Sequence, residues 1–234
     1  MESALEIEKC TISPTALVPN SPKPLLIYKH CFLRHGRLDL PHAYDTFTAN
    51  HWDPKWVVRY GRQQTSHYHP TTHEVMIVLS GRGRIRWGEA DLGDPANWRE
   101  HTYGEAHETG GLETEAEAGD VFLVPAGVAH KSFDADSGQP DAVVLTGETA
   151  HAIDSVDPRE KVIDVERQGK LTGFVMMGAY PRGVEWTWAV GGDHIGRVCD
   201  ADKQDGRRKH SGDSNITPVI MKQHLGLREL SKVS

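Results

Sequence analysis

Short runs of β-branched and aromatic residues recur along most of this chain, and nearly every run ends at or near a glycine or at a Pro-Ala-Gly turn. Such runs, bounded by turn residues, are typical of strands in antiparallel sheets. They predict an all-β protein built as a sandwich or barrel. The runs are KPLLIYKHCFL, KWVVRYG, EVMIVLSG, GRIRWGE, DVFLVPAG, DAVVLTG, GFVMMGAY and VEWTWAVGG.

The length and composition favour a single domain with appendages. The 234 residues are 38% apolar and 25% charged, which is enough to bury one sizeable core. We expect an N-terminal tail at residues 1–24, punctuated by Pro and Ser, and then one domain at residues 25–198. A polar linker and C-terminal extension, residues 199–234, would follow. Because this extension regains apolar character in ITPVIMKQHLGL, we expect it to pack on the outside of the barrel.

Two segments interrupt the strand pattern and are predicted to be loop insertions. Residues 89–117 carry nine acidic residues, one arginine and several glycines, and we interpret them as a mobile flap beside the mouth of a pocket in the barrel. Residues 147–171 hold a charged stretch that favours a short helix. Residues 40–52, LPHAYDTFTANHW, are expected to form another short helix.

The charge and the cysteine content limit the partners and the compartment. A formal net charge of -7 argues against nucleic acid and anionic membranes, because neither polyanion is attracted to such a surface. Cys10, Cys31 and Cys199 are odd in number and widely spaced, so we expect free thiols in a reducing compartment. The N-terminus is acidic where a signal peptide is basic, and no apolar run reaches membrane-spanning length. We expect a cytoplasmic protein whose partners are small molecules or other proteins.

Three histidines and a glutamate crowd into the segment GRQQTSHYHPTTHEVMIVLSG, residues 61–81. His67 and His69 are separated by one residue, so on extended backbone both side chains leave the same face and can reach one metal ion. Glu74 begins the apolar strand and could add a carboxylate ligand. His73 has the opposite side parity, which favours an outer or supporting position over direct coordination. Imidazoles grouped this tightly repel when protonated and need partners when buried, so coordination explains the cluster better than burial alone.

The strand after the histidines is expected to place an apolar wall beside them. If Glu74 points inward, alternation puts Met76 and Val78 on its face of the strand and the intervening residues on the other. Phe122 or Val124 would add to this lining. Five aromatic residues are further candidates for walls, but large aromatics are more often core filler, and we favour that role for each. They are Trp56, Tyr60, Trp87, Trp186 and Trp188.

A second segment, GDVFLVPAGVAHKSFD at residues 119–134, repeats this arrangement with an apolar strand, a Pro-Ala-Gly turn and then His130. Together the two segments resemble the paired signatures of the cupin superfamily, G-x5-H-x-H-x4-E-x6-G and G-x5-P-x-G-x2-H-x3-N. Asp134 stands where the second signature usually has Asn, which is not a ligand position. The matching positions are Gly61, His67, His69, Glu74, Gly81, Gly119, Pro125, Gly127 and His130.

A second, weaker resemblance covers roughly residues 25–190. LLIYK, HYHPTTHEV and GAYPRG are similar to segments of a family of small single-domain cupins from bacteria and fungi. Most members of that family lack an assigned activity.

The resemblance to cupins implies a double-stranded β-helix, the jelly-roll barrel, with a few short helices. It also implies a homodimer, for which the apolar strand LLIYKHCFL is the expected contact, and one divalent metal ion. Four ligands on a six-coordinate ion leave two positions for water, substrate or dioxygen, as a catalytic site requires. The set suits Fe, Mn, Ni or Zn and does not choose among them. The implied ligands are His67, His69, Glu74 and His130.

Three classes of function remain open at this point. We favour a metal-dependent oxygenase, in which Fe(II) binds dioxygen and a chelating small organic substrate. The second class is a non-redox isomerase, lyase or decarboxylase, in which the metal is a Lewis acid and a side chain moves a proton. His73, Arg59 and Tyr60 are the candidates for that side chain. The third is a non-catalytic, small-molecule-binding cupin, against which the intact ligand set counts.

Overall fold

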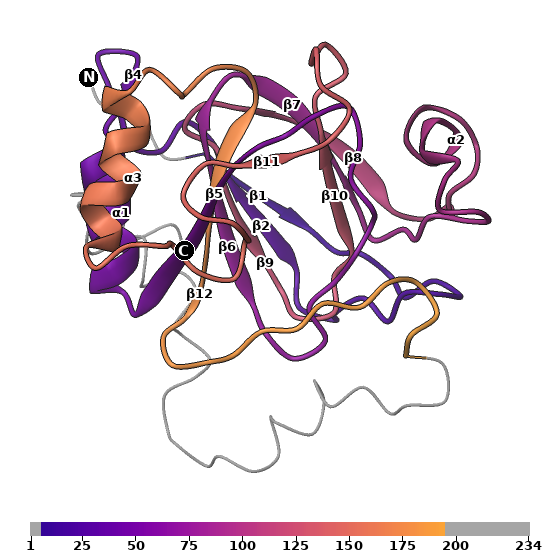
Figure 1. Cartoon of the computed structure of the whole chain (residues 1–234). Coiled ribbons are helices and arrows are strands. Elements are labelled where there is room, and N and C mark those ends of the chain that lie inside the picture. The colour runs from indigo at the N-terminus through magenta and orange to yellow at the C-terminus, as the bar shows by residue number, and fades with distance from the viewer. Residues whose placement is uncertain (1–5, 195–234) are drawn as a thin grey trace, which may run out of the picture.

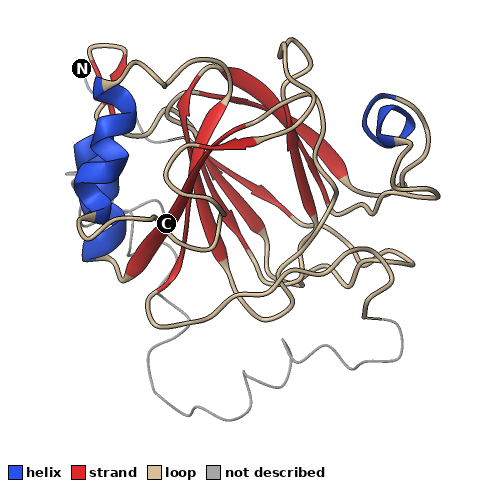
Figure 2. Cartoon of the chain, viewed as in Figure 1, coloured by secondary structure: helices blue, strands red, loops and turns tan. Residues whose placement is uncertain are grey.

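Antiparallel strands dominate this computed structural model, which describes residues 6–194; the predicted extension at 199–234 lies outside that range. The strands form a seven-stranded and a three-stranded sheet, which face each other as the walls of one barrel (Figure 2). The predicted all-β barrel is confirmed. The larger sheet has the order β1 (Ile7–Cys10), β2 (Leu25–Tyr28), β9 (Val121–Val124), β6 (Glu74–Ser80), β12 (Val175–Pro181), β5 (Trp52–Arg59) and β11 (Val143–Val144). The smaller sheet has the order β10 (His130–Phe133), β7 (Arg82–Trp87) and β8 (Leu112–Glu117), while β3 (Leu33–Arg34) and β4 (Arg37–Leu38) form a separate hairpin.

One cluster of buried apolar residues fills the space between the two sheets. Met76 and Val78 of β6 belong to it, together with Trp87 of the smaller sheet. The alternate residues of β6, such as Val75 and Ile77, belong to a second cluster on the outer face of the larger sheet. The predicted alternation is therefore confirmed. Because both faces of β6 are buried, its residues between Glu74 and Ser80 form an unbroken apolar run.

Two helices cover the outer face of the larger sheet. They are α1 (Leu40–Ala49) and α3 (Pro158–Arg167), and Figure 1 shows them side by side against that wall of the barrel. Asp39 and Asp157 cap them, since each aspartate side chain accepts a hydrogen bond from a backbone N–H of the first turn. Both predicted short helices are confirmed. Among the described residues, no helix combines the length and the apolar character needed to cross a membrane.

The described part of the predicted N-terminal tail packs on the barrel. β1 pairs with β2, from Ile7 opposite Tyr28 to Cys10 opposite Leu25, so KPLLIYKHCFL supplies the second strand and not the first. Farther along the predicted tail, Val18 is fully buried. The tail region thus contributes a strand and core contacts.

The strand predicted to form a dimer contact is covered by its own chain. Leu26 and Tyr28 of β2 are buried in the outer cluster, which also contains residues of α1. Leu25 and Ile27 on the other face are buried inside the barrel. The homodimer stays a prediction, but β2 does not offer a free apolar face to support it.

Two segments depart from the predicted strand pattern. LETEAE, inside the predicted insertion at 89–117, forms β8 and pairs with β7 along its whole length. Only Ala116 of β8 is fully buried, so this strand lacks the apolar content that marks strands in a sequence. VEWTWAVGG, a predicted strand, joins neither sheet; in the described structure only Ala189 pairs, in an isolated bridge with Tyr68.

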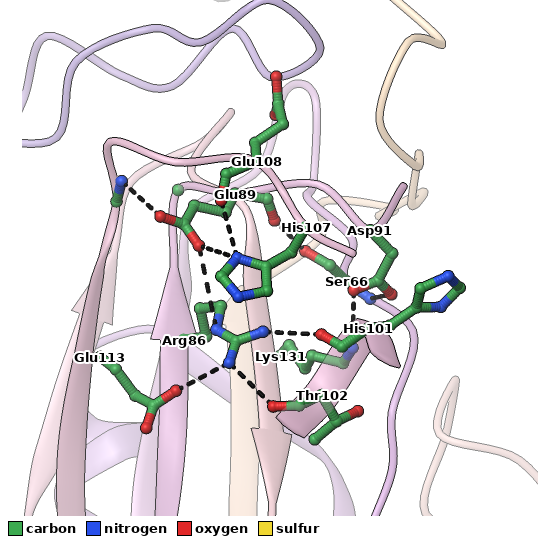
Figure 3. Close-up of polar contacts among 12 residues, drawn as sticks. Ser66, Arg86, Glu89, Asp91, His101, Thr102, His107, Glu108, Glu113 and Lys131 are labelled. Carbon is green, nitrogen blue, oxygen red and sulfur yellow. Dashed lines mark hydrogen bonds and ion pairs between the residues drawn. The ribbon is translucent and has the colours of Figure 1, made fainter. Parts of the chain in front are cut away.

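Buried charged groups hold the first insertion on the outer face of the smaller sheet (Figure 3). Arg86 of β7 donates hydrogen bonds of 2.7 and 2.9 Å to two carbonyl oxygens in α2 (Trp98–Tyr103). Glu89 accepts a hydrogen bond of 2.8 Å from Nδ1 of His107. Figure 3 shows these side chains converging between the strands and the insertion. Such anchoring argues against the hypothesis that residues 89–117 are a mobile flap.

Gly178 of β12 marks a place where the barrel has no room for a side chain. A Cβ atom there would lie 2.0 Å from Cζ2 of Trp56, whose indole is buried in the barrel. We predict that Gly178→Ala lowers the free energy of unfolding by about 1–3 kcal/mol, because overpacking forces the indole or the strand to move. Chemical denaturation measures this difference. Gly138→Ala is the control, since no atom lies within 4 Å of a Cβ at that position; equal stability of both variants would contradict the prediction.

Candidate metal centre

Three histidines from the two signature segments meet at one end of the barrel. His67 and His69 lie on extended chain ahead of β6, and His130 begins β10. The backbones of His67 and His130 form an antiparallel bridge, with N–H to carbonyl distances of 3.1 and 2.8 Å. One ring nitrogen of each histidine lies within 4.8 Å of those of the other two. Tyr68, between the first two histidines, faces the opposite side, where it is buried against Val18. The three histidines are thus brought together as the sequence predicts.

Each of the three imidazoles directs its Nδ1 atom at a backbone carbonyl oxygen. A carbonyl oxygen only accepts hydrogen bonds, so Nδ1 carries the hydrogen and Nε2 keeps its lone pair. This arrangement orients metal-ligating histidines in proteins generally. The pairs are His67 with Thr65 at 3.1 Å, His69 with Thr187 at 2.9 Å and His130 with Val128 at 3.3 Å.

Glu74 places a buried carboxylate beside these nitrogens. Its Oε2 atom lies 3.4 Å from Nε2 of His69 and 3.1 Å from Nε2 of His130. Within residues 6–194, no hydrogen bond of normal geometry reaches this oxygen. A carboxylate oxygen that faces two imidazole nitrogens needs a cation between them, which is either a proton or a metal ion. The residues therefore fit a bound metal ion.

The environment sets which of these groups are charged without a metal. Burial, together with the charges of His130 and His69, lowers the pKa of His67 well below its ordinary value, so this ring stays in the neutral, ligating form. Burial lowers the pKa of His69, but Glu74 outweighs it and raises the pKa overall. Burial also raises the pKa of Glu74, but the contacts with His69 and His130 outweigh it and hold the pKa below its usual range. The metal-free site thus favours an ionised Glu74 beside a neutral His67.

Tyr180, on the inner face of β12, is a site residue that the sequence reasoning missed. Its hydroxyl donates a hydrogen bond of 2.5 Å to Oε1 of Glu74, accepts one of 3.3 Å from the indole N–H of Trp56, and lies 3.3 Å from Nε2 of His69. Burial and the charge of Glu74 raise the pKa of Tyr180 well above its ordinary value, so the phenol stays protonated. Strand alternation from Met176 would have placed Tyr180 on the inner face.

The segment after β12 brings two tryptophans against the histidines. Trp186 packs edge-on against His69, and Trp188 against His67, each with ring centroids 5.0 Å apart. The carbonyl of Thr187, between them, is the one that orients His69. Figure 1 shows this segment, in orange, running along one end of the barrel. The core-filler interpretation is wrong for Trp188, which is half exposed, whereas Trp186 is partly buried and also packs against the barrel core. The interpretation is confirmed for Trp56, Tyr60 and Trp87, which are buried in the barrel core.

The three candidates for proton transfer lie in different environments. His73 accepts a hydrogen bond of 2.8 Å at Nδ1 from the backbone N–H of Ala126, so it supports the Pro-Ala-Gly turn. Arg59 is on the outer face of β5 and donates to the carbonyl of Lys170 at 2.9 Å. Arg59 therefore lies outside the site, so its prediction as a proton-transfer residue is wrong. Tyr60, the next residue, is buried on the inner face, because neighbouring side chains of a strand point to opposite faces.

Asp91 supports the two chain segments that carry the histidines. Its carboxylate accepts hydrogen bonds from the backbone N–H of Ser66 at 2.9 Å and from Nζ of Lys131 at 2.6 Å. Ser66 and Lys131 are the neighbours of His67 and His130 in the chain. Figure 3 shows Asp91 and Lys131 in the same network that anchors the insertion. The insertion thus braces the site from outside the barrel.

We predict that Asp91→Ala lowers the free energy of unfolding by about 3–5 kcal/mol, because it leaves the Lys131 ammonium group, which is 1% exposed, buried without its partner. Chemical denaturation provides the measurement. Arg82→Ala is the control, because Arg82 is 71% exposed and pairs with Glu117 at the surface. Its removal is expected to change stability by less than about 1 kcal/mol. Similar losses in the two variants would show that Asp91 is not a buried support.

Comparisons with known proteins agree with this architecture. The family model described as Cupin matches residues 61–158. The uncharacterized protein YjlB of Bacillus subtilis is 30% identical over 132 residues, which are 55% of this chain and 61% of YjlB, so the chain spans less than two thirds of that relative.

Similar solved structures include an uncharacterized double-stranded β-helix protein from Klebsiella pneumoniae, with 11% identity, a TM-score of 0.28 and coverage of 82% of this chain and 89% of that one. An oxalate decarboxylase from Lactobacillus farciminis has 9% identity and a TM-score of 0.29, and the match covers 95% of this chain and 40% of that one. The family match contains both signature segments and the strands that unite their histidines, so over residues 61–158 the chain is similar to the cupin family.

Proposed function

We propose that this protein is a metal-dependent enzyme, an Fe(II)-type oxygenase that acts on a small organic molecule. The observation that carries the proposal is the convergence of three imidazoles whose Nδ1 atoms are held by carbonyl oxygens. Their Nε2 atoms are thereby left for one ion beside the buried oxygen of Glu74. His67, His69, Glu74 and His130 would hold that ion.

The ligand set favours a catalytic over a structural ion. Structural zinc sites are closed by four ligands in a tetrahedron, whereas this set on a six-coordinate ion leaves two positions free. When bound, the ion supplies Lewis acidity and, in the case of iron, reactivity toward dioxygen. Iron, manganese, nickel and zinc all suit these ligands.

The chain surrounds the centre with apolar and aromatic groups. Met76, Val78, Phe122 and Val124 are all buried in the cluster that fills the barrel. They keep bulk water from the inner side of the centre and so strengthen its electrostatic interactions. Trp188, which is half exposed, contacts His67 from the outer side. Such surroundings suit an organic substrate with an apolar part.

A non-redox isomerase, lyase or decarboxylase is the second candidate function. The observation that favours it is the protonated phenol of Tyr180 in contact with Glu74, which provides a group able to hold or donate a proton. A cupin that only binds a small molecule is the third. A binding protein has no need of a carboxylate and three imidazoles around one point, which counts against it.

Removal of any one histidine tests the metal centre. We predict that His67→Ala, His69→Ala and His130→Ala each retain less than about a tenth of the wild-type metal content, measured by mass spectrometry on protein purified without a histidine tag. Their melting temperatures should change less, because the barrel core is formed by apolar clusters apart from the histidines. His73→Ala is the matched control and should keep its metal. Full metal content in the His67 and His130 variants would refute the site.

Activity assays then separate the three functions. Oxygen-electrode measurements on the iron-loaded protein, with a panel of phenols, diketones and thiols, should reveal substrate-dependent oxygen uptake. Conversion of a substrate without oxygen uptake would instead favour the isomerase, lyase or decarboxylase. Saturable binding with no conversion of any compound would favour a binding protein.

A further inference from the structure

Tyr180 contacts two of the proposed metal ligands without being one of them. We propose that it is a positioning residue, whose hydroxyl holds Oε1 of Glu74 so that Oε2 alone is presented to the ion. This inference rests on the proposed metal centre and assigns a role within it that no signature position covers.

The hydrogen atoms around Tyr180 have one consistent arrangement. The phenol has a single hydrogen, and Oε1 of Glu74, at 2.5 Å, is its nearest acceptor. The indole N–H of Trp56 can only donate, so the phenol oxygen accepts from it at 3.3 Å. Nε2 of His69 lies farther away, at 3.3 Å, and keeps its lone pair because the hydrogen is on Nδ1, facing the carbonyl of Thr187. A directed chain therefore runs from Trp56 through Tyr180 to Glu74.

Packing holds the phenol in this position independently of its hydrogen bonds. The Tyr180 ring is 1% exposed and stacks on Trp186, with centroids 4.7 Å apart and planes at 16°. It also meets the edge of His69 at 5.2 Å. Gly178, two residues earlier in β12, leaves the space that the Trp56 indole occupies. A phenylalanine at position 180 would keep these ring contacts and lose only the hydroxyl.

The hydroxyl of Tyr180 limits the ways in which the Glu74 carboxylate could coordinate a metal ion. A free carboxylate can coordinate an ion through one or both oxygens. With Oε1 engaged by the phenol, Glu74 would coordinate a bound ion through Oε2 alone, which lies near His69 and His130. Compared with coordination through both oxygens, this would leave one more position on the ion for a substrate. Mutation of a residue that holds a metal ligand in this way typically lowers the affinity for the metal by about 10–100-fold.

Tyr180→Phe tests the inference with cobalt(II) alone as the probe. Titration of the metal-free full chain should give a dissociation constant about 10–100-fold higher than that of wild type. The visible absorption of bound cobalt(II) should also change, since Glu74 is free to bind through both oxygens. The melting temperature of the metal-free variant should stay close to that of wild type. Tyr60→Phe is the matched control: Tyr60 is also buried on the inner face but packs against Trp56 and Phe174.

A double-mutant cycle with Glu74→Gln shows whether Tyr180 acts through the carboxylate. In that background Tyr180→Phe should have little further effect on cobalt(II) affinity. Wild-type affinity and spectrum in Tyr180→Phe would overturn the inference and leave the metal centre standing. Equal weakening by Tyr60→Phe, or an undiminished effect in the Glu74→Gln background, would also overturn it. Failure of the wild-type protein to bind cobalt(II) would overturn the metal centre and this inference together.

Discussion

The antiparallel bridge between His67 and His130 is the contact on which the candidate site depends. Its two backbone hydrogen bonds tie the chain ahead of β6, in the larger sheet, to the first residue of β10, in the smaller one. The bridge therefore joins the two walls of the barrel at one end. It also places the ring centroids of the two imidazoles 4.4 Å apart. Closing the barrel at this end and assembling the centre are achieved by the same hydrogen bonds.

The centre is stable in an apolar barrel only if its polar atoms have partners. Each Nδ1 atom has a carbonyl oxygen, and Oε1 of Glu74 has the hydroxyl of Tyr180. The remaining atoms, Oε2 and the Nε2 atoms, face one another, and one cation satisfies them together. The surrounding protein already fixes their directions, so little reorganisation would be needed for a metal ion to bind. Preorganisation of this kind is what metal sites generally require for affinity and selectivity.

Charged groups outside the barrel brace the same end of the molecule. Asp91 links the neighbours of His67 and His130 to the acidic insertion, and Arg86 attaches α2 of that insertion to β7. A segment whose composition resembles a solvent-exposed loop thus contributes a barrel strand and a buried polar network. Some of its acidic residues have a structural role, because Glu89 and Asp91 accept hydrogen bonds inside the network.

Strand periodicity and signature spacing are local properties of a chain, and they were sufficient to predict the barrel, the alternation of β6 and the meeting of His67, His69 and His130. The contact of Tyr180 with Glu74, 106 positions away, and the orientation of His69 by the carbonyl of Thr187, 118 positions away, are seen only in the folded chain. These contacts follow from the pairing of β12 with β6 and from the path of the chain after β12, which no local pattern specifies. The same reason explains β8: its polar sequence becomes a strand because β7 offers it a complete antiparallel partner.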